Sequence, residues 1–271
     1  MTPAALLVRR EIATALRARW FAAYAAIFLL SGLLLAAVGG GDALIAGYRG
    51  FARAFAGLVH LALLFVPLMA LLPATAAIAD ERESGALEYL LAQPVTATEV
   101  YLGKWVGLAA ALGLALTVGF GAAGAVAVAR GVPPGLLAVL FGQVVLLALV
   151  FVAIGLGLSA LTTSRARATT VAVVVWLGLV ALGTLGILIA FIRWGAPAWA
   201  LTVWTFVNPI EAFRLGVVSA LDPDLSLLGP AGARIVDRVG PYGTNALAAL
   251  SLALWALVPG LAGLAVFSRP K

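Results

Sequence analysis

Long apolar segments constrain the fold of this chain more than any other feature of its sequence. About six segments of roughly 20 predominantly apolar residues follow one another, and a helix of that length crosses the hydrocarbon of a bilayer. Residues 171–192, for example, are apolar on every face, whereas a strand of a membrane β-barrel alternates apolar and polar residues. The sequence therefore predicts an all-α polytopic membrane protein.

The scarcity of charge excludes a water-soluble globular enzyme. Hydrophobic residues make up 64% of the 271 residues and charged residues only 10%, against roughly a quarter charged in an ordinary soluble domain. The net charge is +6 at pH 7, but the arginines are scattered between the apolar segments. Because nucleic-acid binding requires a clustered basic surface, we expect membrane lipid, and no nucleic acid, as a partner.

The apolar segments and the residues between them predict a single transmembrane domain over residues 1–271. Residues 1–19 place Ala5, Val8, Ile12 and Leu16 on one helical face, which indicates an amphipathic interfacial helix. The segment 80–104 is predicted to be a cytoplasmic coupling segment, and 193–243 an extracytoplasmic helical insertion between spans five and six. The six predicted transmembrane helices are 20–38, 54–79, 105–129, 136–161, 170–192 and 244–267.

The distribution of Lys and Arg predicts the orientation. An even number of spans leaves both termini on one side of the membrane, and that side carries more basic residues than the other. Because basic loops stay inside, we expect a multi-pass protein of the cytoplasmic (inner) membrane with both termini in the cytoplasm.

Glycine, proline and histidine inside the spans predict local packing. Ala109 with Gly113, and the group Gly119, Gly121 and Gly124, have spacings that permit close helix contacts. Pro67 and Pro73 are expected to kink the second span unless neighbouring helices satisfy the freed carbonyls. His60 is expected to make an interhelical hydrogen bond rather than bind a metal.

The most informative stretch is the charged segment that follows the second span. Leu87, Leu90 and Leu91 share one face of a short helix that Pro94 prevents from continuing. We expect Glu81, Glu83 and Glu88 to remain solvated or to meet basic residues of a partner. Thr96 and Glu99 have the spacing of a capping box that opens the next helix. An ordinary solvated loop is the alternative interpretation.

Residues 81–95 also match the pattern E-R-E-x-G-x-L-E-x-L-L-x-x-P-V. In this pattern the chain resembles the permease subunits of ABC-2 type exporters, in which that segment contacts the ATPase. The resemblance implies a dimer of two permease copies bound to a cytoplasmic ABC ATPase dimer. The residues that it assigns to ATPase coupling are Glu81, Arg82, Glu83, Gly85, Leu87, Glu88, Leu90, Leu91 and Pro94.

The sequence lacks the motifs of an enzyme or of a metal site. No G-x-x-x-x-G-K-[ST] phosphate loop occurs, so ATP and Mg are expected to be bound by the partner ATPase and not by this chain. With no cysteine, one histidine and two methionines, the chain offers no soft ligand set for copper. We therefore expect no catalytic residue, no metal and no cofactor in this chain.

The region between the last two spans predicts a second contact surface. Asn208 is placed to cap a helix that starts at Pro209, with Glu211 in its first turn. Residues 208–232 resemble the Nos-type permeases of nitrous oxide reductase maturation, which implies a periplasmic β-helical accessory protein as a partner. A surface loop with a purely structural role is the alternative. The residues assigned to extracytoplasmic docking are Asn208, Pro209, Glu211, Arg214, Asp222, Asp224, Arg234, Asp237 and Arg238.

The leading hypothesis is a permease subunit that couples ATP hydrolysis by a separate ATPase to transport or to conformational relay, in the maturation of a copper enzyme. One alternative is an ABC-2 exporter of lipid, drug or polysaccharide. An alternative of another class is a membrane-embedded enzyme or scaffold, which would tolerate charge reversal at Glu83 and Glu88.

Overall fold

The computed structural model is built from helices. It describes residues 3–38, 48–129, 133–186, 189, 193, 195, 197–222, 225 and 229–269, and none of these forms a β-strand. The prediction of an all-α chain is therefore confirmed for the described residues. The helices are α1 (Pro3–Arg17), α2 (Arg19–Val38), α4 (Tyr48–Glu83), α5 (Ala86–Leu91), α6 (Ala97–Ala129), α7 (Pro134–Leu161), α8 (Arg165–Ala181), the π-helix η1 (Leu182–Gly186), α10 (Ala198–Val207), α11 (Pro209–Leu221) and α12 (Gly229–Phe267).

Among the described residues, four helical segments are long and apolar enough to cross a membrane. They are Ala62–Glu83, Ala97–Ala129, Pro134–Leu161 and Tyr242–Phe267. The chain is thus a multi-pass membrane protein. The predicted number of six spans stays a prediction, as do the spans 20–38 and 170–192, which fall on α2 and on α8 with η1.

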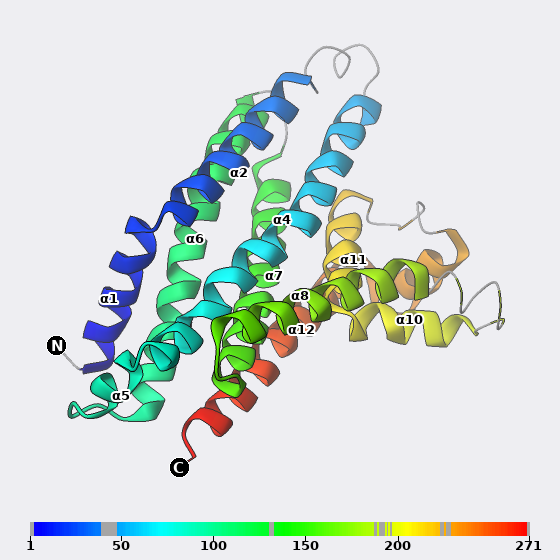
Figure 1. The fold of residues 1–271 in the computed structure, drawn as a ribbon. Coiled ribbons are helices and arrows are strands. Elements are labelled where there is room, and N and C mark those ends of the chain that lie inside the picture. Colours follow the sequence, from blue (N-terminus) through cyan, green and yellow to red (C-terminus); the bar gives the residue numbers. More distant parts are fainter. Residues whose placement is uncertain are drawn as a thin grey trace.

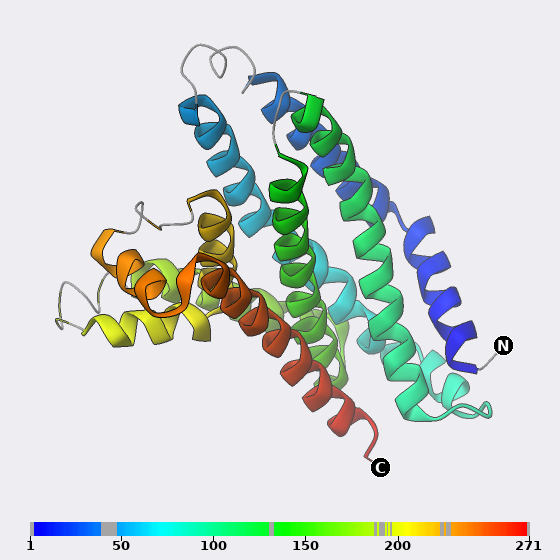
Figure 2. The same cartoon turned by 180° about the vertical axis from the view of Figure 1, so that it is seen from behind.

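Helix α7 is at the centre of the bundle. It packs against α4 on one side and α12 on the other, and also contacts α11, α6 and α8. Helices α1 and α2 lie along α6, while α8, α10 and α11 lie on the opposite side of the molecule (Figures 1 and 2). Both ends of the chain lie at the same end of the molecule as α5 (Figure 1), as an even number of spans requires.

Helix α4 extends further than the predicted second span. It continues without interruption through Pro67 and Pro73 and ends only at Glu83. Its last part is held by Ser159 of α7, whose hydroxyl accepts hydrogen bonds from the amides of Ile78 and Ala79 at 3.1 and 2.9 Å. The same hydroxyl donates to the carbonyl of Thr75 at 2.7 Å. Ser159 therefore ties the part of α4 after Pro73 to α7.

Close contacts between helices occur at glycines other than the predicted ones. A Cβ atom at Gly113 or Gly121 would meet nothing within 4 Å, so the expectation of close contacts there is wrong within the described residues. At Gly103 and Gly107, by contrast, a Cβ atom would lie 2.8 Å from Leu7 Cβ and 2.4 Å from Glu11 Cβ. Helix α1 therefore lies directly against the backbone of α6. The side chain of His60 lies outside the described residues.

The face of α1 that packs on α6 differs from the predicted apolar face. The buried positions are Leu7 and Ala15, with Glu11 between them facing α6. Ala5 is exposed and Leu16 is 44% exposed. Of the predicted apolar face, Val8 and Ile12 are half-buried, and only Ala5 and Leu16 are left open, where lipid can cover them.

Candidate functional site

Each of the four residues that end α4, Asp80 to Glu83, bonds to another part of the chain. They were predicted to start a cytoplasmic loop, but they form the last turn of a long helix. We call them the α4 terminus. Their partners lie on α6, α7 and α8 or at the turn between α7 and α8, and Lys104 of α6 connects Glu81 onward to α1. The α4 terminus therefore joins elements that are far apart in the sequence.

Glu81 belongs to a buried ion-pair cluster around Lys104. The ammonium of Lys104, on α6, lies 2.8 Å from Glu81 Oε1 and 3.1 Å from Glu11 Oε1 on α1. Lys104 is only 2% exposed, and removing one partner from a buried ion pair leaves an uncompensated charge. A single lysine therefore holds the N-terminal helix, α6 and the end of α4 together.

Arg82 and Glu83 hold the corner between α7 and α8. The Arg82 guanidinium donates to the carbonyl of Thr162 and, at 3.2 Å, to that of Ala160. A cation at this place offsets the negative end of the α7 helix dipole. Glu83 Oε2 accepts a hydrogen bond from the Arg165 amide at 3.1 Å, where the start of α8 leaves backbone donors without a partner.

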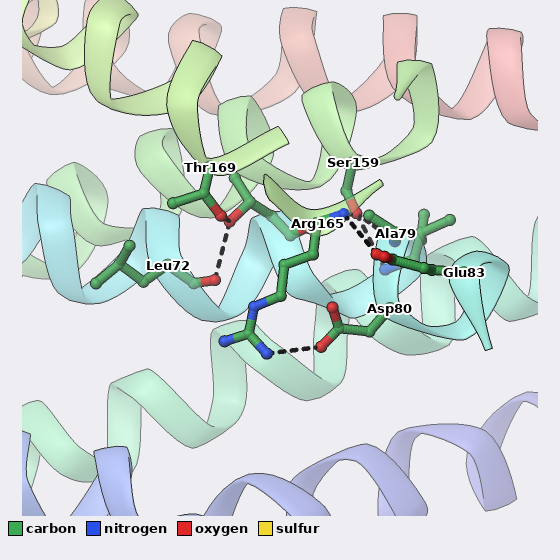
Figure 3. A network of polar contacts seen from close by, with 9 residues as sticks. Leu72, Ala79, Asp80, Glu83, Ser159, Arg165 and Thr169 are labelled. Atoms are coloured by element: carbon green, nitrogen blue, oxygen red, sulfur yellow. Dashed lines mark hydrogen bonds and ion pairs between the residues drawn. The ribbon is translucent and has the colours of Figure 1, made fainter. Parts of the chain in front are cut away.

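Asp80 and Arg165 add an exposed ion pair to this corner. Arg165 Nη1 lies 3.0 Å from Asp80 Oδ2, with the two side chains 61% and 42% exposed. Figure 3 shows Asp80 and Glu83 of α4 pointing toward Arg165 at the start of α8. An exposed pair of this kind contributes about 0–1 kcal/mol. The hydrogen bonds of Arg82 and Glu83 to backbone groups therefore contribute most of the stability of the contact between α4 and the corner of α7 and α8.

Helix α5 follows the α4 terminus after a two-residue turn. Gly85 has φ +75°, a left-handed conformation that favours glycine. Leu87 and Leu90 are buried, while Leu91 is 39% exposed, so the predicted three-leucine face contains only two buried members. The side chain of Glu88 is exposed and that of Tyr89 is 75% exposed. We call Glu88, Tyr89 and Leu91 the outer face of α5.

The predicted capping box is confirmed. Glu99 Oε2 accepts from the Thr96 amide at 2.8 Å, and the Thr96 hydroxyl accepts from the Glu99 amide at 3.2 Å. Helix α6 starts at the next residue, Ala97. Pro94 follows the end of α5 at Leu91 by three residues, so the two helices are joined by a short, fixed turn.

The expectation that Glu81 remains solvated or meets a partner is wrong. Its carboxylate is paired with Lys104 inside the chain, because α6 starts directly after the turn and brings Lys104 back beside α4. Glu83 is exposed as expected, yet its carboxylate bonds to the Arg165 amide. Glu88 alone of the three has no partner among the described residues and faces outward.

Sequence reasoning missed Glu11 and Ser159. Glu11 is the only acidic residue before Asp42, and Lys104 is the only lysine before the C-terminal residue. Their rarity was a signal that could have suggested a pair. Ser159 carried no such signal, because small hydroxyl residues are common in membrane helices.

Comparison with known proteins identifies the family. The profile of a family described as "ABC-2 family transporter protein" matches residues 5–271. The chain belongs to the ABC-2 transporter family. It is 33% identical over 260 residues to the "Probable ABC transporter permease protein NosY" of Pseudomonas aeruginosa, covering 92% of each chain. It is 32% identical over 232 residues to the protein of the same name from Stutzerimonas stutzeri, covering 82% of this chain and 84% of that one.

Membership in the ABC-2 family defines the kind of subunit. Members of this family are membrane subunits of transporters, so the chain is an ABC transporter permease rather than a catalytic subunit. Association with an ATPase partner and dimerisation follow in general terms from the family.

The predicted docking residues fall into a buried group and an exposed group. Asn208 caps α11 as predicted, because its side chain accepts from the Ile210 amide at 2.9 Å. Asn208, Pro209 and Glu211 are buried, and Arg214 Nη1 lies 2.9 and 3.0 Å from the two carboxylate oxygens of Glu211. Burial raises the pKa of the Glu211 carboxyl, and Arg214 opposes that shift.

The remaining docking residues extend from the end of α11 into α12. Asp222 is partly buried, and Asp237 and Arg238 are exposed. Asp224 and the side chain of Arg234 lie outside the described residues. In this chain the buried residues therefore position α11, and an extracytoplasmic docking role for the segment stays a prediction.

Proposed function

We propose that this permease receives the movement of a separate ATPase at the outer face of α5 and passes it into the membrane through the α4 terminus. The observation that carries the proposal is the bonding of four consecutive residues to α6, α7 and α8, with α1 attached to the same cluster through Lys104. Because α5 follows this terminus after two residues, a force on α5 acts on all of these helices at once. ATP and Mg stay in the partner, and a second copy of the permease completes the membrane part.

The outer face of α5 has the composition of a contact surface. Tyrosine is over-represented among the residues that dominate binding energy in protein interfaces, and Tyr89 is the most exposed residue of α5 that carries a large apolar side chain. Leu87 and Leu90 anchor the other side of the helix in the core. A partner that binds Tyr89 therefore meets a helix that is fixed from behind.

Replacing Tyr89 by alanine should weaken ATPase binding at least about fivefold, since truncating a central interface residue costs more than about 1 kcal/mol. Co-purification of the ATPase with the tagged permease, measured across a concentration series, tests this. Tyr242→Ala is the matched control, because Tyr242 is 91% exposed but lies on α12. Equal loss in both variants, or none in Tyr89→Ala, would remove α5 as the binding surface.

The orientation of α5 can be tested independently. The chain contains no cysteine, so single cysteines at Tyr89 and Tyr242 can be labelled without other changes. We expect a membrane-impermeant maleimide to label Tyr89→Cys only from the cytoplasmic side, and Tyr242→Cys only from the opposite side. Labelling of Tyr89→Cys from outside would place α5 beyond reach of any cytoplasmic ATPase.

Membrane lipid is the partner proposed for the exposed basic residues of the N-terminal helices. Arg17 and Arg19 are exposed and directly precede Trp20, and a tryptophan at the start of an apolar helix is typical of the headgroup level. Glu11, the acidic residue nearest to them in sequence, is turned toward Lys104. Anionic headgroups therefore offer a counter-charge that the described residues do not supply to Arg17 and Arg19.

The process we propose is maturation of nitrous oxide reductase, a copper enzyme. Two similarities support this proposal. The chain is similar to the proteins named NosY, over 92% of its length for the Pseudomonas relative, and residues 208–232 resemble that type of permease. Under this proposal, the permease either transports a species to a periplasmic β-helical protein or relays a conformational change to it. The competing proposal is export of lipid, drug or polysaccharide.

Purification of the intact complex separates these two proposals. We expect mass spectrometry to find the permease, a cytoplasmic ABC ATPase and a periplasmic β-helical protein in one detergent-solubilised complex. An exporter would yield the permease and ATPase without the periplasmic component. Recovery of the permease without any ATPase would remove the permease proposal itself.

A further inference from the structure

We infer that α8 is a strut that carries movement of the α4 terminus to α11, and that Asn208 is the positioning residue at its far end. The inference rests on the proposed function, because that function supplies the movement. One side of α8 is not packed against the rest of the chain, because Val171, Val174 and Leu177 are each more than 40% exposed. The helix is nonetheless fixed at both ends.

The near end of α8 is fixed to α4. Glu83 Oε2 accepts from the Arg165 amide at 3.1 Å, at the first residue of the helix. One turn further, the hydroxyls of Thr169 and Thr75 lie 3.3 Å apart. Figure 3 shows these contacts on the same flank of α4. A displacement of the α4 terminus therefore displaces the start of α8.

The far end of α8 is fixed to α11 by one buried amide. Asn208 Nδ2 donates to the Leu179 carbonyl at 2.8 Å, while Oδ1 of the same side chain accepts from the Ile210 amide at 2.9 Å. Asn208 is 3% exposed. One side chain thus starts α11 and holds the last turn of α8, so the two helices cannot separate without leaving buried polar groups unpaired.

A π-helix and a glycine make this far contact possible. Directly after α8 the chain forms the π-helix η1 (Leu182–Gly186), a geometry found mostly as single turns and frequently at functional sites. A Cβ atom at Gly183 would lie 2.8 Å from Glu211 Oε1 and 3.1 Å from Asn208 Nδ2. An added Cβ would therefore push the ends of the Glu211 and Asn208 side chains away from η1.

The geometry between the two ends suits transmission. The 14 residue steps from Arg165 to Leu179 span about 21 Å at 1.5 Å per residue, and the segment is continuous α-helix. Figure 1 shows α8 running from the end of α4 toward α10 and α11. Helix α11 is bonded in turn to α12, because Asn245 Nδ2 donates to the Gly216 carbonyl at 2.8 Å. This bond is separate from the contact between α8 and Asn208, so movement delivered by α8 reaches α11 before it reaches α12.

The test uses single cysteines carrying an environment-sensitive fluorophore in the permease purified with its ATPase. Ala86→Cys, an exposed position at the start of α5 and not part of its outer face, reports on α5, and Trp199→Cys, an exposed position on α10, reports on the far side. We expect a non-hydrolysable ATP analogue to change the emission at both. Asn208→Ser keeps a helix-capping hydroxyl but cannot reach Leu179. It should reduce the response at Trp199→Cys at least about fivefold, the lower end of typical coupling between sites, and leave the response at Ala86→Cys unchanged.

Two further variants serve as a control and as a second test of the contact between α8 and α11. Asn245→Ala removes a similar amide-to-carbonyl bond on α11 but leaves α8 attached, and should keep both responses. Gly183→Ala places a Cβ atom against the Asn208 amide from the η1 side. It disturbs the same contact while keeping the asparagine, and should reproduce the loss at Trp199→Cys even if Asn208→Ser does not accumulate. An unchanged Trp199→Cys response in Asn208→Ser or Gly183→Ala overturns the strut and leaves the proposed function standing. Absence of a response at Ala86→Cys in the otherwise unaltered chain contradicts the proposed function instead.

Discussion

Replacing Lys104 by methionine should destabilise the permease by about 3–5 kcal/mol, the cost of removing one member of a buried ion pair. The change leaves the carboxylates of Glu11 and Glu81 without the cation that both contact within 3.1 Å. Glu81 Oε2 already has no hydrogen-bond partner in the described structure, so the site has no spare donor. We expect a large drop in the thermal unfolding midpoint of the detergent-solubilised protein.

The matched control for this change is Arg165→Met. It also removes one cation from an ion pair with an α4-terminus carboxylate, but that pair is exposed, so the cost should stay within about 0–1 kcal/mol. A triple variant, Lys104→Met with Glu11→Gln and Glu81→Gln, should recover much of the lost stability because the buried charges are gone. If Lys104→Met and Arg165→Met unfold at the same temperature, the cluster does not hold the fold together.

Gly107→Leu should separate α1 from α6. Even a single Cβ at this position would lie 2.4 Å from Glu11 Cβ and 3.4 Å from the Val8 carbonyl oxygen. Both atoms belong to or adjoin the α1 backbone, so a rotamer change cannot relieve the clash. Overpacking typically costs about 1–3 kcal/mol and occasionally more, and here displacement of α1 also breaks the pair between Glu11 and Lys104.

The displacement can be measured directly. A cysteine at Leu7, which is 9% exposed, should react slowly with a thiol reagent in the otherwise unaltered chain and rapidly with Gly107→Leu. Gly113→Leu is the control on the same helix, since a Cβ there meets nothing within 4 Å. It should leave the Leu7→Cys reaction unchanged. Equal reactivity in the two glycine variants would contradict the close approach of α1 to α6.

The contacts of the α4 terminus change how the proposed coupling is tested. Charge reversal at Glu83 disturbs the first amide of α8 as well as any partner contact, so loss of ATPase binding in that variant has two causes. Tyr89 has no such double role, because its side chain is 75% exposed on the outer face of α5. Variants at Tyr89 therefore test partner binding, and variants at residues 80–83 test transmission inside the chain.

Local patterns in the sequence were enough to predict much of the coupling segment. The capping box of Thr96 and Glu99 spans four residues, and its hydrogen bonds depend on little outside that turn. The cap of α11 by Asn208 is equally local. The leucine face of α5 was predicted less well, because burial of Leu91 depends on neighbours rather than on periodicity.

The choice of packing face could not be predicted in the same way. On α1 the apolar residues mark the face suited to lipid, while the packed face contains Glu11, whose charge is neutralised by Lys104. In a membrane protein both lipid and neighbouring helices accept apolar side chains, so hydrophobic periodicity does not say which face meets protein. The same ambiguity explains why Gly103 and Gly107, rather than Gly113 and Gly121, make the close contacts.

The sequence by itself determined that the chain is helical, apolar enough to enter a membrane, and marked after its second long apolar segment by an acidic helix of the ABC-2 pattern. These properties depend on composition and on residues within one or two helical turns. The tertiary structure alone decided that Lys104 pairs with Glu11, 93 residues away, and that Glu83 holds the start of α8, 82 residues away. The physical reason is that a buried charge or a free backbone amide is satisfied by whichever group the packing brings within about 3 Å, and separation along the chain does not constrain that choice.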